Sequence, residues 1–157
     1  MVYYVAILFT VKILVLLFIL FMPMISRDPT LEQRLYDLHN EARIGLQPLR
    51  WDSTLAELAI RDATRNADRG YLEHDGIYRD EVRAAFPDAV WIGENLFYHK
   101  NGPNTDNIDL AAVIMERWMG SPGHHDNILF PGYDLIGIGI VVQGGIHWIA
   151  VLFVDVY

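Results

Sequence analysis

The sequence contains no cysteine among its 157 residues. This absence excludes a disulfide framework, a thiolate zinc site and a cysteine nucleophile, so an exported domain would have to be stable by packing alone. Basic residues are also scarce, with 12 Lys and Arg against 20 Asp and Glu and a formal net charge of −8. Because proteins that bind nucleic acid normally present a basic face, we expect no nucleic-acid partner.

Charged residues are almost absent from the first 26 positions, where Lys12 is the one charged side chain. A helix rises about 1.5 Å per residue, so a segment of this length crosses a bilayer core of about 30 Å. We therefore expect residues 1–26 to be a membrane-spanning signal anchor or a signal peptide, followed by a separate domain over residues 27–157. The lack of a small-x-small cleavage triplet near Ser26 favours the anchor. Both alternatives place the domain outside the cytoplasm, secreted or tethered to the membrane.

Helix signals recur through the first three quarters of this domain. Asp28 followed by Pro29 is typical of a helix start, and glycine or proline marks several helix ends. The predicted helices cover residues 28–45, 52–70, 79–86 and 106–118, the last capped by Asp106 or Asn107. The alanines of the second helix would let it approach a sheet closely.

Strand signals lie at residues 91–98, 135–142 and 146–154. Gln143-Gly144-Gly145 between the last two segments indicates an antiparallel hairpin. Gly137 and Gly139, at a period of two, give one strand face without side chains where another element can come close. Because helices precede and flank the strands, the expected fold class is α+β, with helices covering an antiparallel sheet that ends in the hairpin.

Glu94 is the most informative acid of the sequence. The period of two places it on the same strand face as Ile92 and Leu96. A carboxylate on an apolar face costs several kcal/mol unless it is paired, hydrogen-bonded or bound to a metal. Glu94 is therefore a candidate functional residue, with a structural salt bridge or a backbone contact as an equally weighted alternative.

Histidines mark two further polar segments. Residues 120–123 form a turn, and His124, His125 and Asn127 follow it, so we expect these side chains on a loop. His74 lies on a second polar loop. Near the end of the first helix, the side chains of His39, Asn40 and Arg43 are expected to bond loop backbone rather than to catalyse.

Taken together, these segments resemble the CAP superfamily, also called SCP/TAPS after cysteine-rich secretory proteins, antigen 5 and pathogenesis-related 1 proteins. The resemblance is closest to its short, cysteine-free bacterial members. It is carried by Leu38-His39-Asn40-Glu41-Ala42-Arg43, His74, Gly93-Glu94-Asn95-Leu96, residues 118–129 and Ile136-Gly137-Ile138-Gly139. It implies a three-layer α-β-α sandwich with an open cleft and a tetrad of two histidines and two glutamates associated with divalent metal binding.

The resemblance assigns tetrad positions residue by residue. His74 matches the first histidine, Glu94 the first glutamate and His124 the second histidine. The second glutamate lies three residues after the helix-ending tryptophan, where this chain has Ser121. The tetrad is therefore incomplete, and an activity that depends on the second carboxylate is in doubt.

The implied chemistry leaves two function classes open. His74, His124 and Glu94 form a candidate site for zinc or a similar divalent ion, with Asn95, Ser121, His125 and Asn127 as cleft or supporting residues. If all three bind, a fourth position remains for a water molecule, and metal-dependent hydrolysis by a protease or cell-wall enzyme becomes possible, with Glu94 as a catalytic residue. If Glu94 only hydrogen-bonds a ligating histidine, metal binding would be weak.

The function class that the sequence favours is a binding module outside the cytoplasm, with the hydrolase as the alternative. Its cleft would capture a small molecule, lipid, glycan or peptide, and the missing second glutamate favours this function. Whether the protein is an enzyme stays open at this point. The Ser121 hydroxyl is expected to bond loop backbone rather than to act as a nucleophile with His124.

Overall fold

The computed structural model describes residues 26–100 and 109–156. Residues 1–25, which carry nearly all of the expected membrane segment, lie outside these ranges, as do Asp106 and Asn107, the expected caps of the fourth helix. No helix within the described ranges is long and apolar enough to cross a membrane.

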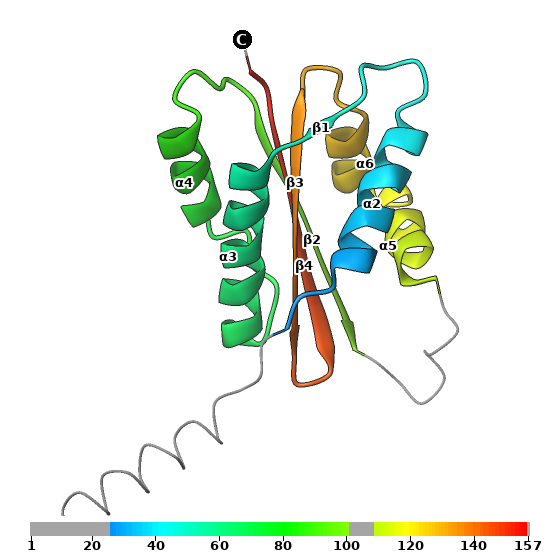
Figure 1. Ribbon diagram of the computed structural model, residues 1–157, viewed down its shortest axis with the longest axis vertical. Coiled ribbons are helices and arrows are strands. Elements are labelled where there is room, and N and C mark those ends of the chain that lie inside the picture. The colour runs from blue at the N-terminus through cyan, green and yellow to red at the C-terminus, as the bar shows by residue number, and fades with distance from the viewer. Residues whose placement is uncertain (1–25, 101–108, 157) are drawn as a thin grey trace, which may run out of the picture.

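The described residues form helices and a single mixed sheet (Figure 1). The elements are α2 (Pro29–Ala42), β1 (Arg50–Trp51), α3 (Ser53–Arg69), α4 (Ile77–Ala85), β2 (Ile92–Lys100), α5 (Leu110–Met119), α6 (Pro122–Leu129), β3 (Leu135–Gln143) and β4 (Ile146–Val154). Asp28 and Asp52 cap α2 and α3 as expected, whereas Asp109 caps α5. The α+β class is confirmed.

The sheet has the strand order β1-β3-β4-β2. The expected antiparallel pairing holds for β3 with β4 and for β4 with β2. Gly144 and Gly145 join the hairpin with φ of +61° and +75°, which fits a two-residue turn of type I′. The two-residue strand β1 pairs parallel with β3, a pair that the sequence did not predict because two residues cannot show an alternating pattern.

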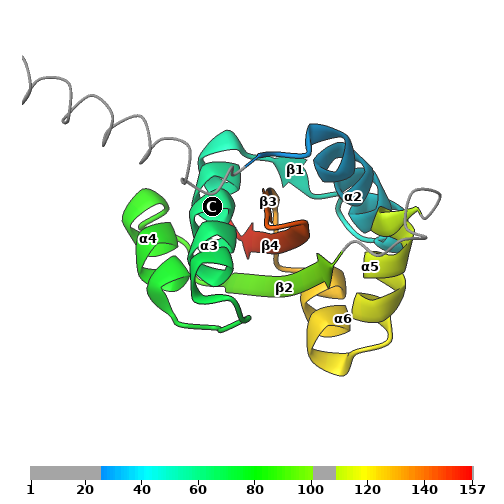
Figure 2. The same ribbon diagram turned by 90° about the horizontal axis from the view of Figure 1, so that it is seen from below.

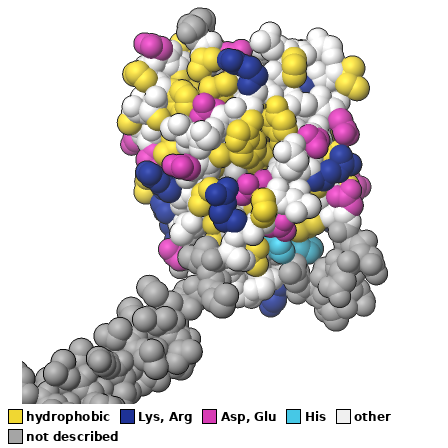
Figure 3. Space-filling model, in the orientation of Figure 1, with side chains coloured by type: hydrophobic (Ala, Val, Ile, Leu, Met, Phe, Trp, Pro, Cys, Tyr) yellow, Lys and Arg dark blue, Asp and Glu magenta, His cyan; other side chains and the backbone are white. Residues whose placement is uncertain are grey.

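Short as it is, β1 leaves most of the β3 edge without a strand partner among the described residues. Figure 3 shows apolar side chains at the middle of the molecular surface that lies over this edge, between α3 and α2. Acidic and basic side chains are interspersed around them. Residues 135–141 of β3 are buried, so this edge is covered and does not offer a bare backbone for pairing with another strand.

Helices cover both faces of the sheet, which confirms the three-layer α-β-α sandwich. Figure 2 shows α3 and α4 on one side and α2, α5 and α6 on the other. A Cβ atom built on Gly137 would lie 2.2 Å from the backbone of Leu55, and one built on Gly139 would lie 2.2 Å from the backbone of Ala59. The expected close approach therefore involves α3, and it seats that helix directly on the sheet.

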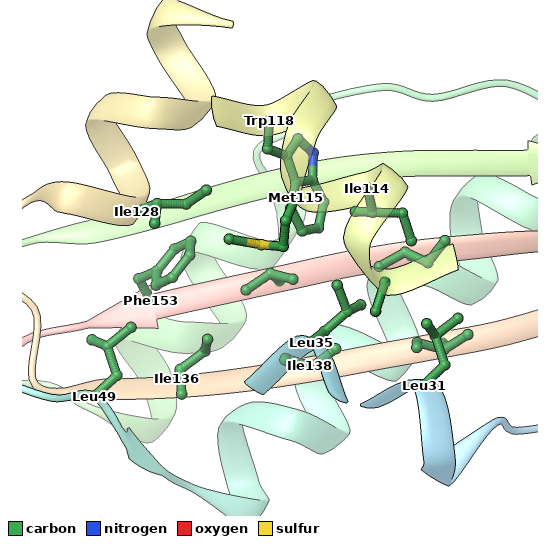
Figure 4. Packing of buried hydrophobic residues seen from close by; sticks show 14 of the residues in the cluster. Leu31, Leu35, Leu49, Ile114, Met115, Trp118, Ile128, Ile136, Ile138 and Phe153 are labelled. Atoms are coloured by element: carbon green, nitrogen blue, oxygen red, sulfur yellow. The ribbon is translucent and has the colours of Figure 1, made fainter. Parts of the chain in front are cut away.

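Helices α2 and α5 pack on the sheet face opposite α3 and form the second core layer (Figure 4). Trp118, at the end of α5, is buried among Ile114, Ile128 and residues of β4. Its indole Nε1 donates a hydrogen bond of 3.1 Å to the carbonyl of Leu96 on β2. This bond fixes the end of α5 against the sheet, and α6 begins three residues later.

His39 is fully buried in this layer. Its ring lies 5.6 Å from the Trp118 ring and 5.7 Å from the Phe153 ring, and its Nδ1 is 2.7 Å from the Leu35 carbonyl. The expected bond to loop backbone is therefore wrong for His39, which bonds its own helix. Burial, which disfavours the imidazolium, lowers the pKa of His39 from 6.5 to about 4.

This shift predicts that His39 weakens the fold in acid. Between pH 6.5 and pH 4 the unfolded chain binds a proton at His39 and the folded chain does not. The free energy of unfolding therefore falls as pH falls, by up to about 1.4 kcal/mol per pH unit from this residue. Urea unfolding of the wild type and of His39→Leu at pH 7, 6 and 5 measures the effect. As pH falls, the free energy of unfolding should decrease more for the wild type than for His39→Leu. An equal decrease in both proteins would contradict this account.

Candidate functional site

Strand β2 buries Glu94 against helix α3. The residue is 4% exposed, and its Oε2 contacts Nδ1 of His74. The carboxyl group of Asp62 on α3, which is fully buried, lies nearby. Burial and the neighbouring Asp62 carboxyl raise the pKa of Glu94 far above its usual range. The expected carboxylate on an apolar face is therefore present, and it is paired rather than isolated.

His74 lies on the connection between α3 and α4, and its side chain is 59% exposed. The backbone N–H of Glu73 donates to Asn66 Oδ1 at 2.7 Å. On the other side, the carboxylate of Asp75 pairs with Arg69 and lies 3.6 Å from Nε of Arg65. The connection is thus fixed on both sides of His74, whose Nδ1 is directed at Glu94.

His124 lies on helix α6 rather than on the expected loop. Pro122 interrupts α5 but is well suited to the first position of a new helix, because its fixed φ is helical and its missing N–H would have had no partner there. Ser121 occupies the cap position, and its hydroxyl makes no capping hydrogen bond. The expectation that this hydroxyl bonds the loop backbone is therefore not met at the cap.

The environment of His124 favours a neutral imidazole. Burial and the nearby His74 ring lower its pKa, and its buried Nδ1 has no hydrogen-bond partner. A neutral imidazole with an unengaged nitrogen is the form that binds metal ions. His74, 50 residues earlier in the sequence, thus contributes to the lowered pKa of His124.

Two asparagines link α6 to β2. Asn127 Nδ2 donates to the Glu94 carbonyl at 3.0 Å and to Asn95 Oδ1 at 2.9 Å. In turn, Asn95 Nδ2 donates to the His124 carbonyl at 3.1 Å. Asn95 and Asn127 therefore form a hydrogen-bond network that joins α6 to β2. His125 instead contacts its neighbour Asp126 at 3.2 Å on the exposed side of α6.

Two residues of the site were missed by the sequence analysis. Asp62 belongs to α3, and Tyr78, on α4, is 5% exposed. Burial and the proximity of Glu94 raise the pKa of Tyr78. A signal for Asp62 did exist, because it falls on the buried stripe of Leu55, Leu58 and Ala59, where a polar residue is out of place.

The structure does not arrange His74, Glu94 and His124 as a three-residue metal cluster. No group of three or more His, Asp or Glu side chains in residues 26–100 and 109–156 is arranged to hold a metal ion. Glu94 Oε2 is engaged by His74 Nδ1, which leaves Nε2 of that ring for a ligand. A carboxylate that holds the far nitrogen of a ligating histidine fixes the tautomer and orientation of that ring.

Comparisons with known proteins point to one family. The sequence model described as CAP, the cysteine-rich secretory protein family, matches residues 36–153. The uncharacterized membrane protein YlbC of Bacillus subtilis is 31% identical over 118 residues, which are 71% of this chain and 32% of that protein. The chain thus spans about a third of that relative's length.

Solved structures share the fold. An outer surface protein of Borrelia burgdorferi superposes with a TM-score of 0.73 at 19% identity, covering 87% of this chain and 100% of that chain. An extracellular protein of Bacillus anthracis that contains an SCP domain superposes with a TM-score of 0.65 at 23% identity, covering 82% of this chain and 41% of that chain.

Proposed function

We propose that this chain, which belongs to the CAP family, is an extracytoplasmic binding module in which His74 and His124 hold a divalent metal ion. The observation that carries the proposal is the hydrogen bonding and protonation of the two imidazole rings. The buried Glu94 engages Nδ1 of His74, and the neighbouring His124 has an unengaged nitrogen and a lowered pKa. Two imidazoles prepared in this way are typical ligands of zinc or a similar ion.

The proposed location outside the cytoplasm rests on the sequence and on the names of similar proteins. The first 26 residues are apolar apart from Lys12. The B. subtilis relative is named a membrane protein, and the B. anthracis structure is named an extracellular protein. We infer that the domain is tethered to a membrane through its N-terminal segment or secreted.

In this proposal the protein's own residues set the strength of the metal site. His74 and His124 supply two nitrogens, and Glu94 orients His74 without binding the ion. When bound, the ion offers its remaining coordination positions to donor groups of a small molecule, lipid, glycan or peptide. The site should therefore bind zinc more weakly than a site with three protein ligands.

Calorimetric zinc titration of the full chain tests the proposal. We expect measurable binding to the wild type and its loss in both His74→Ala and His124→Ala, because one imidazole alone is a poor zinc site. His125→Ala is the matched control, since it removes an exposed imidazole from the same helix, next to His124. Unchanged binding in either of the first two variants, or equal loss in the control, would refute the proposal.

A metal-dependent hydrolase is the second candidate function. It is favoured by the buried Asp62–Glu94 pair, because the raised pKa of Glu94 keeps a proton near the site at neutral pH, as a general acid requires. Turnover of casein or peptidoglycan that requires zinc and disappears in Glu94→Gln would support it. The binding module predicts no turnover and only about 10-fold weaker zinc binding in Glu94→Gln, since the amide oxygen can still accept from His74.

A further inference from the structure

Helix α3 places a second carboxyl group directly behind Glu94. Asp62 is 0% exposed, and its Oδ1 accepts a hydrogen bond of 3.1 Å from Nη2 of Arg65. Its Oδ2 and Oε1 of Glu94 are both buried atoms that no N–H group reaches. Neither atom has a hydrogen-bond partner, and the two carboxyl groups lie near enough for each to affect the pKa of the other.

The contacts of Glu94 thus form a chain from the helix to the exposed histidine. One carboxyl oxygen of Glu94 meets His74 Nδ1, and the other is buried without a hydrogen-bond partner, as is Oδ2 of Asp62. Asp62 belongs to a helix that is seated on the sheet at Gly137 and Gly139 without intervening side chains. A group on such a rigid support can fix the side-chain angles of Glu94, and through Glu94 the orientation of the His74 ring.

The same helix also holds the His74 connection. Arg65, the cation that contacts Asp62, donates to Glu81 at 2.9 Å and lies 3.6 Å from Asp75. Asp75 is the residue after His74, and it pairs with Arg69 of α3 as well. Both the backbone and the ring of His74 are therefore positioned from α3.

We propose that Asp62 is a positioning residue of the site, which acts on Glu94 from helix α3. It holds Glu94 against Nδ1 of His74, so that Nε2 is the nitrogen presented to a metal ion. This inference rests on the proposed function for its effect on metal affinity. Its effect on the His74 ring is independent of metal.

Two readouts on three variants test the role of Asp62. Asp62→Ala removes the contact, Asp62→Asn keeps a side chain that can hydrogen-bond both Glu94 and Arg65, and Asp68→Ala removes an exposed acid from the same helix. Nitrogen-15 NMR of the metal-free full chain reports which nitrogen of His74 carries the proton. Calorimetric titration with zinc reports the affinity of the same proteins.

The expected results separate positioning from a general structural effect. His74 should carry its proton on Nδ1 in the wild type and in the variants Asp62→Asn and Asp68→Ala. The zinc affinities of these three proteins should agree within about 3-fold. In Asp62→Ala, His74 should become a mixture of tautomers, and zinc affinity should fall about 10- to 100-fold. If Asp62→Ala does not fold, Asp62→Ser replaces it, because the shorter serine side chain keeps polarity but ends short of Glu94.

Each contrary outcome has a distinct meaning. A His74 tautomer that stays on Nδ1 in folded Asp62→Ala or Asp62→Ser would overturn the positioning role. Loss of that tautomer in Asp68→Ala as well would also overturn it. Failure of the wild type to bind zinc would refute the proposed function, while the tautomer measurement would still decide the role of Asp62.

Discussion

Replacing Arg43 by alanine is expected to lower the free energy of unfolding by about 4 kcal/mol. Arg43 follows α2 and is 1% exposed. Its Nη1 donates to the carbonyls of Ile128 at 2.7 Å and Phe130 at 2.9 Å. Its Nε and Nη2 donate to Gln47 at 3.2 Å and 3.0 Å, and Nη2 also reaches the Tyr133 carbonyl at 3.4 Å. Alanine would leave these carbonyls without the donor groups of Arg43.

Arg34→Ala is the matched control, because Arg34 lies on the same helix with its side chain 44% exposed. Its pair with Glu41 at 3.4 Å is a surface contact, and its loss should cost less than about 1 kcal/mol. Urea unfolding followed by circular dichroism compares the two variants. Equal effects would show that the bonds of Arg43 to backbone carbonyls are not what stabilises this part of the fold.

Arg43 also connects the core to the site. Its bond to the Ile128 carbonyl holds the C-terminal end of α6, the helix that carries His124. A folded fraction of Arg43→Ala should therefore bind zinc more weakly than the wild type, although Arg43 does not contact either histidine ring. The expectation that Arg43 bonds loop backbone is confirmed by these contacts.

Replacing Gly139 by alanine is expected to be nearly as damaging, at about 3 kcal/mol. The added Cβ would lie 2.2 Å from the Ala59 carbonyl carbon and 2.2 Å from the Ile60 nitrogen. Both neighbours are backbone atoms of α3, so no side-chain rotation can relieve the clash, and the helix must move away from the sheet. The displacement would also draw Asp62 away from Glu94, because Asp62 belongs to the same helix as Ala59 and Ile60.

Gly123→Ala is the matched control for Gly139→Ala. A Cβ at position 123 would have no atom within 4 Å, and the residue lies in α6. Alanine there should stabilise the protein slightly or leave it unchanged, because alanine favours helix over glycine by about 1 kcal/mol. Thermal unfolding of both variants measures the contrast. If Gly139→Ala were as stable as Gly123→Ala, the close approach of α3 to β3 would be incorrect.

The sequence predicted much of this fold because its strongest signals are local. The capping residues of α2 and α3, the two glycines of the β3–β4 turn and the bare strand face at Gly137 and Gly139 each act through near neighbours or through their own backbone. Helix α6 was missed because proline has two local meanings. It ends a helix that precedes it and starts one that follows it, and the turn expected at residues 120–123 reflects the first meaning alone.

The site was harder to predict because its contacts join distant parts of the chain. His74 and Glu94 are 20 residues apart, and only the family resemblance brought them together with His124. Asp62 was missed although it falls on the buried stripe of α3, because its partner on β2 is distant in sequence and becomes visible only in three dimensions. Once α3 is known to bury Asp62, pairing with another polar group is required by the cost of an isolated buried carboxyl.

X-ray absorption at the zinc edge of the zinc-loaded full chain tests the central claim most directly, because it counts the ligands of the ion. The account predicts two imidazole nitrogens at about 2.0 Å in the wild type and one fewer in His74→Ala or His124→Ala, if zinc is retained at all. Glu94→Gln should keep both imidazoles. A wild-type spectrum with fewer than two imidazoles, or one whose carboxylate oxygen disappears in Glu94→Gln, would contradict the account.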